Sequence, residues 1–123
     1  MPLLTLINTY YYEMPTRSFP VDLVNRVRNL NLVDVLNALC TYCSQDRTYE
    51  PKKNPDSKVF IVEVNGKRFN NLLITGDRWF DLEAKKGGGG AIDLVMYLRQ
   101  ISFVQAVKLL SLLEKEKAEE DDL

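Results

Sequence analysis

The stretch that decides the fold, residues 58–82, reads KVFIVEVNGKRFNNLLITGDRWFDL. Its first seven residues alternate in polarity and are rich in β-branched side chains, a pattern typical of a strand. Asn65-Gly66 follows at once and is the strongest short-range signal for a two-residue type I′ hairpin turn. A return strand over 67–74, a turn at Gly76-Asp77 and a short strand Arg78–Leu82 complete the pattern. The stretch therefore predicts a three-stranded antiparallel β-meander.

Helical patterns flank the meander on both sides. The expected helices are Val21–Leu30, Leu32–Thr41, Ala91–Gln100 and Phe103 to about Glu116. Asn31 is placed to cap the second helix, and Ser102 with Gln105 matches a capping box that opens the last one. Ser44–Ser57 is polar, contains two prolines and is expected to be a loop. The fold class expected is α+β, with the meander packed against the N-terminal and C-terminal helices.

The chain has 123 residues, which suits one domain with one core. We expect three parts: an extended arm (1–20), a folded domain (21–113) and an acidic tail (114–123). The arm holds three consecutive tyrosines and a candidate edge strand, Leu3–Asn8. No apolar run reaches membrane-spanning length, and the first residues make a poor signal peptide. A soluble protein in the cytoplasm is the expectation.

The net charge of −1 hides an asymmetry. The tail contains six acids and two lysines, so residues 1–113 hold 14 basic and 11 acidic residues. A mildly basic body permits a nucleic-acid partner without requiring one. The tail is read first as a solvated helix end, with a partner-binding or self-masking segment as the alternative.

Four glycines, Gly87, Gly88, Gly89 and Gly90, stand directly before a predicted helix, and Lys85 and Lys86 precede them. Such a loop with a helix N-terminus behind it can contact a phosphate through backbone N–H groups. No GxxxxGK[ST] pattern is present, so a nucleotide triphosphate site is disfavoured. Two interpretations remain open: a contact to backbone phosphates, and a tight passage of the chain between sheet and helix.

Basic and aromatic residues gather on the meander, as they do in proteins that bind single strands. They are Lys67, Arg68, Phe69, Arg78, Trp79 and Phe80. Strand alternation puts Arg78 and Phe80 on one side and Trp79 on the other. We expect Trp79 in the core and Arg78 and Lys67 at the surface.

The chain has few of the residues that catalytic and metal sites usually need. The chain has no histidine, and Cys40 and Cys43 are its two cysteines. A tetrahedral zinc site needs four ligands, so one chain would not complete it with Cys and His alone. We interpret the two thiols as structural, with a zinc shared in a dimer or a redox pair as alternatives. No enzyme, cofactor or metal is predicted.

The string from Asp77 to Leu110 resembles the second half of the zinc-finger-type domain at the front of bacterial replicative primases. It is still more similar to metal-free relatives of that domain in plasmid and mobile-element primases, relaxases and replication-associated proteins. In that family an aromatic strand leads to a glycine-rich turn, a "GGxAIDFV"-like helix and an "SFxEAVxLL"-like helix. The matching residues here are Trp79-Phe80, Gly87–Gly90, Ala91–Val95 and Ser102–Leu110.

The resemblance spans Val21–Leu110 and implies a zinc-ribbon-like finger without zinc, because the family's Cys and His ligands are missing at the corresponding places. It implies a DNA-binding accessory module for plasmid or mobile-element replication and priming, directed to single strands. The implied contact residues are Lys67, Arg68, Arg78, Lys85, Lys86 and Gly87–Gly90. The implied partners are single-stranded DNA and a primase or polymerase, a helicase or a relaxase.

A second hypothesis belongs to another class. The chain would be a protein–protein adaptor, or an inhibitor, that docks a replication, relaxase or host defence protein through the meander edge, the tyrosine arm and the acidic tail. A DNA-binding test separates the two hypotheses, since an adaptor needs no affinity for oligonucleotides.

Overall fold

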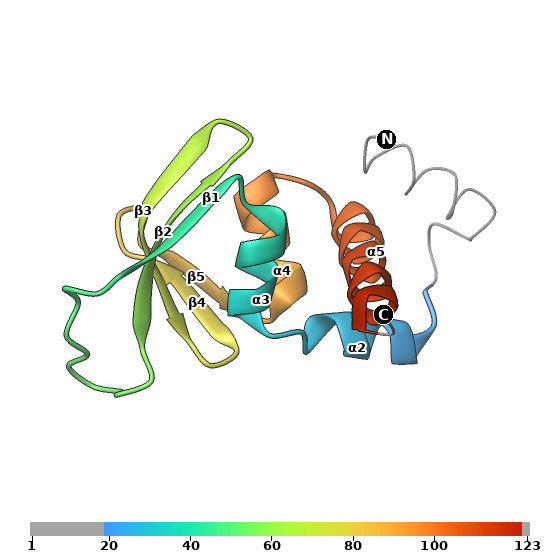
Figure 1. Ribbon diagram of the computed structural model, residues 1–123, viewed down its shortest axis with the longest axis horizontal. Coiled ribbons are helices and arrows are strands. Elements are labelled where there is room, and N and C mark those ends of the chain that lie inside the picture. The colour runs from blue at the N-terminus through green and yellow to red at the C-terminus, as the bar shows by residue number, and fades with distance from the viewer. Residues whose placement is uncertain (1–18, 122–123) are drawn as a thin grey trace.

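The computed structural model describes residues 19–121 of the protein, with side chains as far as Glu116. The predicted arm lies outside the described residues, apart from its last two. Within this range the chain forms an antiparallel sheet and helices that all lie on one side of it (Figure 1). The α+β class is confirmed.

The elements follow the chain in a simple order. The helices are α2 (Val21–Arg28), α3 (Leu32–Leu39), α4 (Ala91–Arg99) and α5 (Phe103–Asp121); the strands are β1 (Tyr42–Asp46), β2 (Lys58–Val64), β3 (Lys67–Thr75), β4 (Arg78–Asp81) and β5 (Lys86–Gly89). Each strand pairs antiparallel with the next, so the sheet order is β1-β2-β3-β4-β5.

The three-stranded meander predicted from sequence is wrong in its number of strands, because the described sheet has five. β1 occupies part of the segment expected to be a loop, and the helix expected to reach Thr41 ends at Leu39. β5 occupies Gly87–Gly89, which were expected to be a glycine loop. The missed strands are the two edges, where pairing with a neighbour rather than local sequence determines the conformation.

The local signals at the turns and caps are confirmed. Asn65 and Gly66 both have positive φ, 51° and 79°, as a type I′ turn requires. The Asn31 side chain accepts a hydrogen bond from the Asp34 N–H at 3.0 Å. Ser102 and Gln105 exchange backbone-to-side-chain bonds of 3.1 and 3.2 Å, which completes the capping box.

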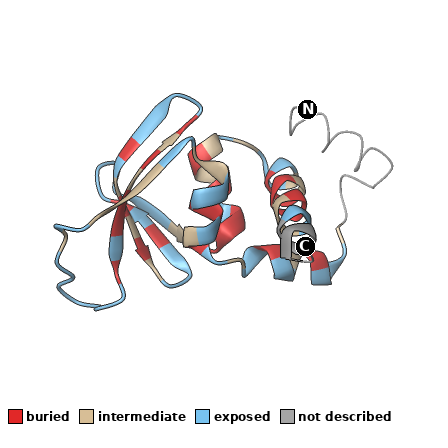
Figure 2. Cartoon of the chain, in the orientation of Figure 1, coloured by how far each residue is buried: buried red, intermediate tan, exposed pale blue. Residues whose placement is uncertain are grey.

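The sheet has an inner face against the helices and an outer face. Side chains of the inner face form one core with the helices, including Phe60, Val62, Phe69, Leu72, Ile74 and Trp79. Trp79 is only 5% exposed, which confirms its predicted place in the core. Figure 2 shows buried residues on the strands and on the helices next to them. The outer face has no helix over it in the described part of the chain (Figure 1).

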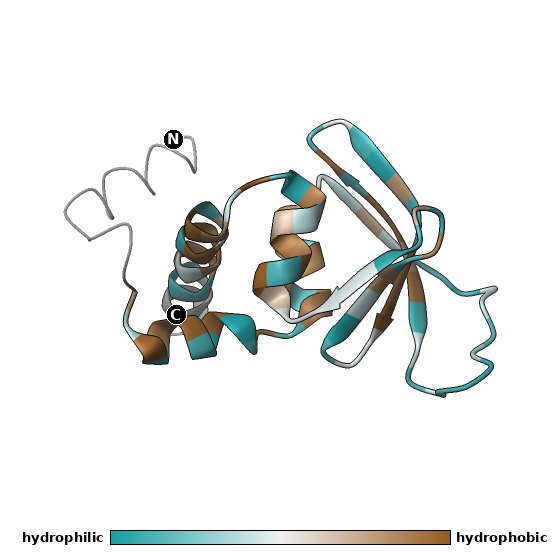
Figure 3. Ribbon diagram, turned by 180° about the vertical axis from the view of Figure 1, so that it is seen from behind, coloured by the Kyte–Doolittle hydropathy of each residue, from teal (hydrophilic) through white to brown (hydrophobic). Residues whose placement is uncertain are grey.

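Helix α4 is the centre of the helical layer. It contacts α2, α3, α5 and β5, and Leu94, Val95 and Leu98 are buried on it. α2 and α5 lie beyond α4 from the sheet (Figure 1). The loop between β1 and β2 is mostly hydrophilic, as Figure 3 shows. None of the helices in the described part of the chain is both long and apolar enough to cross a membrane.

The glycine strand β5 pairs with β4 at very close range. A Cβ atom at Gly87 would lie 2.5 Å from a ring carbon of Phe80 and 2.8 Å from the Trp79 carbonyl oxygen. A Cβ at Gly88 would overlap the Asp93 carboxylate. Gly90 has φ +82°, a left-handed conformation that side chains rarely adopt. These glycines are therefore needed for the chain to pass between β4 and α4, the second of the two sequence-based interpretations.

Replacing single glycines of β5 by alanine tests this close approach. Gly87→Ala should lower the free energy of unfolding by about 1–3 kcal/mol, because the Trp79 backbone cannot move aside without strain. Gly89→Ala is the matched control: its Cβ would meet nothing closer than the Asp77 oxygen at 3.7 Å. Urea denaturation followed by circular dichroism measures both. Equal losses in the two variants would contradict the account.

Candidate functional site

Arg78, a predicted contact residue, and Phe80, a member of the basic and aromatic group, both lie on the outer face of β4. Arg78 is exposed, Phe80 is 38% exposed, and Trp79 between them is buried, so the predicted alternation is confirmed. Arg78 pairs in register with Gly89, and Phe80 pairs with Gly87. The register also puts Leu73 of β3 beside Phe80. We call Leu73, Arg78, Phe80, Gly87 and Gly89 the β4–β5 platform.

The platform is open because β5 carries no side chains over three residues. The Phe80 ring lies against Gly87, as the near overlap with a Cβ there indicates. The platform residues, with Thr75, line a depression of about 560 Å³ on the sheet. An exposed aromatic ring beside a cation, over a surface of bare backbone, is an arrangement on which a planar ring can stack.

Arg68 faces the same side of the sheet but stands far from Arg78. It pairs with Glu63 near the β2–β3 turn, whereas Arg78 pairs with Thr75 at the other end of β3. The seven residue steps from Arg68 to Thr75 span about 23 Å at the usual rise of a strand. The Arg68 guanidinium lies 5.7 Å from the ring centroid of Tyr42. This second cation and aromatic ring extend the outer face beyond the platform.

The remaining predicted cations do not join the platform. Lys67 pairs with Val64 on the inner face, and its Nζ lies 5.1 Å from the centroid of Phe69. Lys86 pairs with buried Asp81 and lines a pocket between β5 and α4. Lys85 is exposed in the β4–β5 turn, with φ 57°.

The backbone at the start of α4 is already engaged within the protein. The Gly89 N–H donates to the Asp93 carboxylate at 3.2 Å, and the Gly90 N–H donates to the Asp77 carbonyl at 2.7 Å. The Asp93 carboxylate thus takes a donor that a bound anion would need. Of the glycines predicted to contact phosphate, Gly88 and Gly90 serve packing and chain direction, while Gly87 and Gly89 lie on the open platform.

A polar cluster behind the platform, which sequence reasoning missed, joins β4 to α4. The Tyr97 hydroxyl donates to the buried Asp81 carboxylate at 2.6 Å, and the N–H groups of Glu83 and Ala84 donate to its other oxygen. The Tyr97 ring stacks on Trp79, with centroids 4.7 Å apart. The pKa of Tyr97 is raised to about 12, chiefly because the side chain is partly buried. The hydrogen bond to Asp81 and the negative charge of Asp81 raise this pKa further. The one sequence signal for this cluster is Asp81, an acidic residue near the end of the expected strand Arg78–Leu82.

The two cysteines sit where α3 ends and β1 begins, and neither is in a disulfide. Burial raises the pKa of the Cys40 thiol to about 12, with Cys43 adding to the rise and Arg99 opposing it. Burial also raises the pKa of Cys43. Such thiols are poor nucleophiles, which suits the structural interpretation. Among the described residues no three His, Cys, Asp or Glu side chains gather as a metal site would need.

No protein family model, curated protein or solved structure matches this chain. The resemblance to the primase finger therefore remains a hypothesis drawn from the sequence motifs.

Tyr97→Phe tests the polar cluster. At neutral pH the variant should lose about 1.5–3 kcal/mol of unfolding free energy, because a bond to a buried carboxylate is removed. The folded pKa lies above the ordinary value of 10, so the Tyr97 contribution is complete below pH 10 and is lost as the pH rises toward 12. The gap between wild type and variant in urea denaturation should narrow over that range. A gap independent of pH would contradict this role.

Thiol reactivity tests the interpretation of Cys40 and Cys43 as structural thiols. At pH 8 Cys40 of the native protein should react with iodoacetamide at least about a hundredfold more slowly than in the urea-unfolded chain, because its thiolate fraction is small, and Cys43 should also react more slowly. Cys40→Ser and Cys43→Ser report each thiol separately by mass spectrometry. Rapid labelling of Cys40 in the folded protein would show instead an activated thiol.

Proposed function

We propose that the protein is a nucleic-acid-binding accessory module that holds single-stranded DNA on the outer face of its sheet. The observation that carries the proposal is that Arg78 and Phe80 share the outer face of β4 on the open β4–β5 platform. In proteins that bind single strands, aromatic rings stack on bases and nearby cations neutralise phosphates. Here the Phe80 ring supplies the stacking surface, and Arg78 supplies the cation two residues away on the same face.

Charge supports modest rather than tight binding. Residues 42–89, which contain the whole sheet, have nine lysines and arginines against seven acids. Affinity for nucleic acid grows with the number of phosphates that the protein neutralises. A small excess of cations suits a module that works beside a larger DNA-handling protein. A role in plasmid or mobile-element replication, beside a primase, helicase or relaxase, is the proposal that follows from the sequence motifs.

Fluorescence anisotropy with a labelled oligothymidine tests the proposal. If Arg68 and Arg78 on the outer face contact two phosphates, log K should fall against log salt with a slope of about −1.4. Phe80→Ala should weaken binding about tenfold and leave the slope unchanged, because stacking involves no counterions. Arg78→Ala should weaken binding and reduce the slope by about 0.7.

Arg26→Ala is the matched control, since Arg26 is an exposed arginine on α2, beyond α4 from the sheet. It should bind as the wild type does. Circular dichroism checks that every variant is folded. The proposal fails if the wild type does not bind at about 50 mM salt, or if Arg26→Ala is as harmful as Arg78→Ala.

A further inference from the structure

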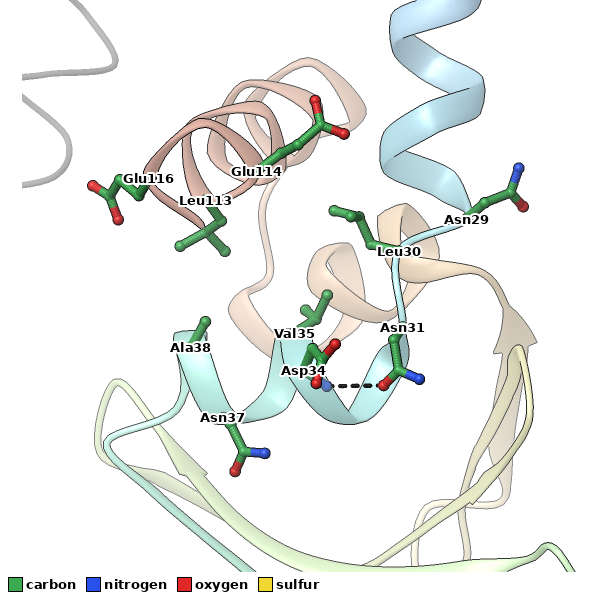
Figure 4. A pocket seen from close by; sticks show the side chains of 10 residues that line it. All are labelled: Asn29, Leu30, Asn31, Asp34, Val35, Asn37, Ala38, Leu113, Glu114 and Glu116. Carbon is green, nitrogen blue, oxygen red and sulfur yellow. Dashed lines mark hydrogen bonds between the residues drawn. The ribbon is translucent and has the colours of Figure 1, made fainter. Parts of the chain in front are cut away.

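A groove runs between α3 and α5, among the helices that lie on the inner side of the sheet (Figure 4). It has a volume of about 570 Å³. Its apolar lining comes from Leu30, Val35, Ala38 and Leu113. Figure 4 shows Leu113 of α5 pointing toward Ala38 of α3 across the opening. We call this the α3–α5 groove.

The rim of the groove is acidic. Asp34, Glu114 and Glu116 line it, and among the described residues no lysine or arginine does. Arg26 of α2 lies beside one end, where its Nη2 is 3.0 Å from a Glu114 oxygen. The last eight residues of α5, 114–121, hold five acids against two lysines, so this end of the helix is acidic overall. The groove thus combines an apolar centre with one sign of charge.

We propose that the α3–α5 groove binds an amphipathic helix of a partner protein, one with lysine or arginine beside its apolar side chains. A groove between two helices is a common seat for a third helix, whose apolar residues fill the centre. Basic residues flanking those positions complement the acidic rim and steer the encounter. This surface goes beyond DNA binding, because it would attach the module to another protein while the outer face of the sheet stays free.

Charge argues against other occupants. DNA would be repelled by the same carboxylates. A second copy of the chain would bring its own acidic α5 toward the rim, and like charges oppose each other there. Residues 1–18 of the chain include many apolar side chains, but they hold one arginine and one glutamate, so they offer no excess of positive charge. A basic partner helix is the occupant that satisfies both the apolar centre and the rim.

The test uses the full chain and a fluorescent model peptide of about 18 residues, roughly 27 Å as a helix. The peptide has leucine at every third or fourth position and lysine elsewhere, and a second peptide has glutamate in place of lysine. The lysine peptide should bind and the glutamate peptide should not. Ala38→Trp fills the groove from an exposed position and should weaken binding about tenfold or more.

Glu116→Lys and Glu50→Lys form a matched pair, since both replace an exposed glutamate and change the net charge equally. Glu116→Lys should weaken binding about threefold, whereas Glu50→Lys, in the β1–β2 loop, should not. Absence of binding, or equal effects of the two lysine variants, would overturn the proposal. A concentration-dependent dimer in ultracentrifugation that Ala38→Trp abolishes would also overturn it, because the groove would then hold a second copy.

Discussion

The position of the side chains on the outer face of the sheet depends on one interaction on its inner face. There α4 packs against β4 through Trp79, Tyr97 and Asp81. β4 has only four residues and β5 is mostly glycine, so neither strand has much intrinsic stability. The stacked rings and the 2.6 Å bond to Asp81 fix β4 against the helix. Because β4 is fixed on its inner side, Arg78 and Phe80 are held outward on the other side.

The same constraint explains the glycines. β5 lies between β4 and the first turn of α4, where side chains at positions 87 and 88 would collide with Phe80, the Trp79 carbonyl and Asp93. Bare backbone is therefore a packing requirement, and it also leaves the platform flat and open. Among the helices on the inner side of the sheet, the acidic α3–α5 groove provides a surface of different chemistry. A DNA contact on the sheet and a protein contact on the helices would not compete for space.

Much of this arrangement was predictable because it is local. The Asn65-Gly66 turn, the Asn31 cap and the Ser102 capping box each depend on a few adjacent residues. The edge strands were missed because Tyr42–Asp46 and Lys86–Gly89 acquire their conformation from pairing. The placement of Lys67 and Lys86 on the inner face could not be read from alternation alone, since it depends on strand register. That register includes an irregularity between Phe60 and Val62.

The most direct test of the central claim is an NMR titration of the ¹⁵N-labelled full chain with an oligothymidine of about eight nucleotides, within the range that one small sheet domain accommodates. The account predicts that the largest amide shifts fall on Arg78, Phe80, Gly87 and Gly89, with α5 unaffected. Shifts confined to the helices, or no shifts at saturating DNA, would contradict it.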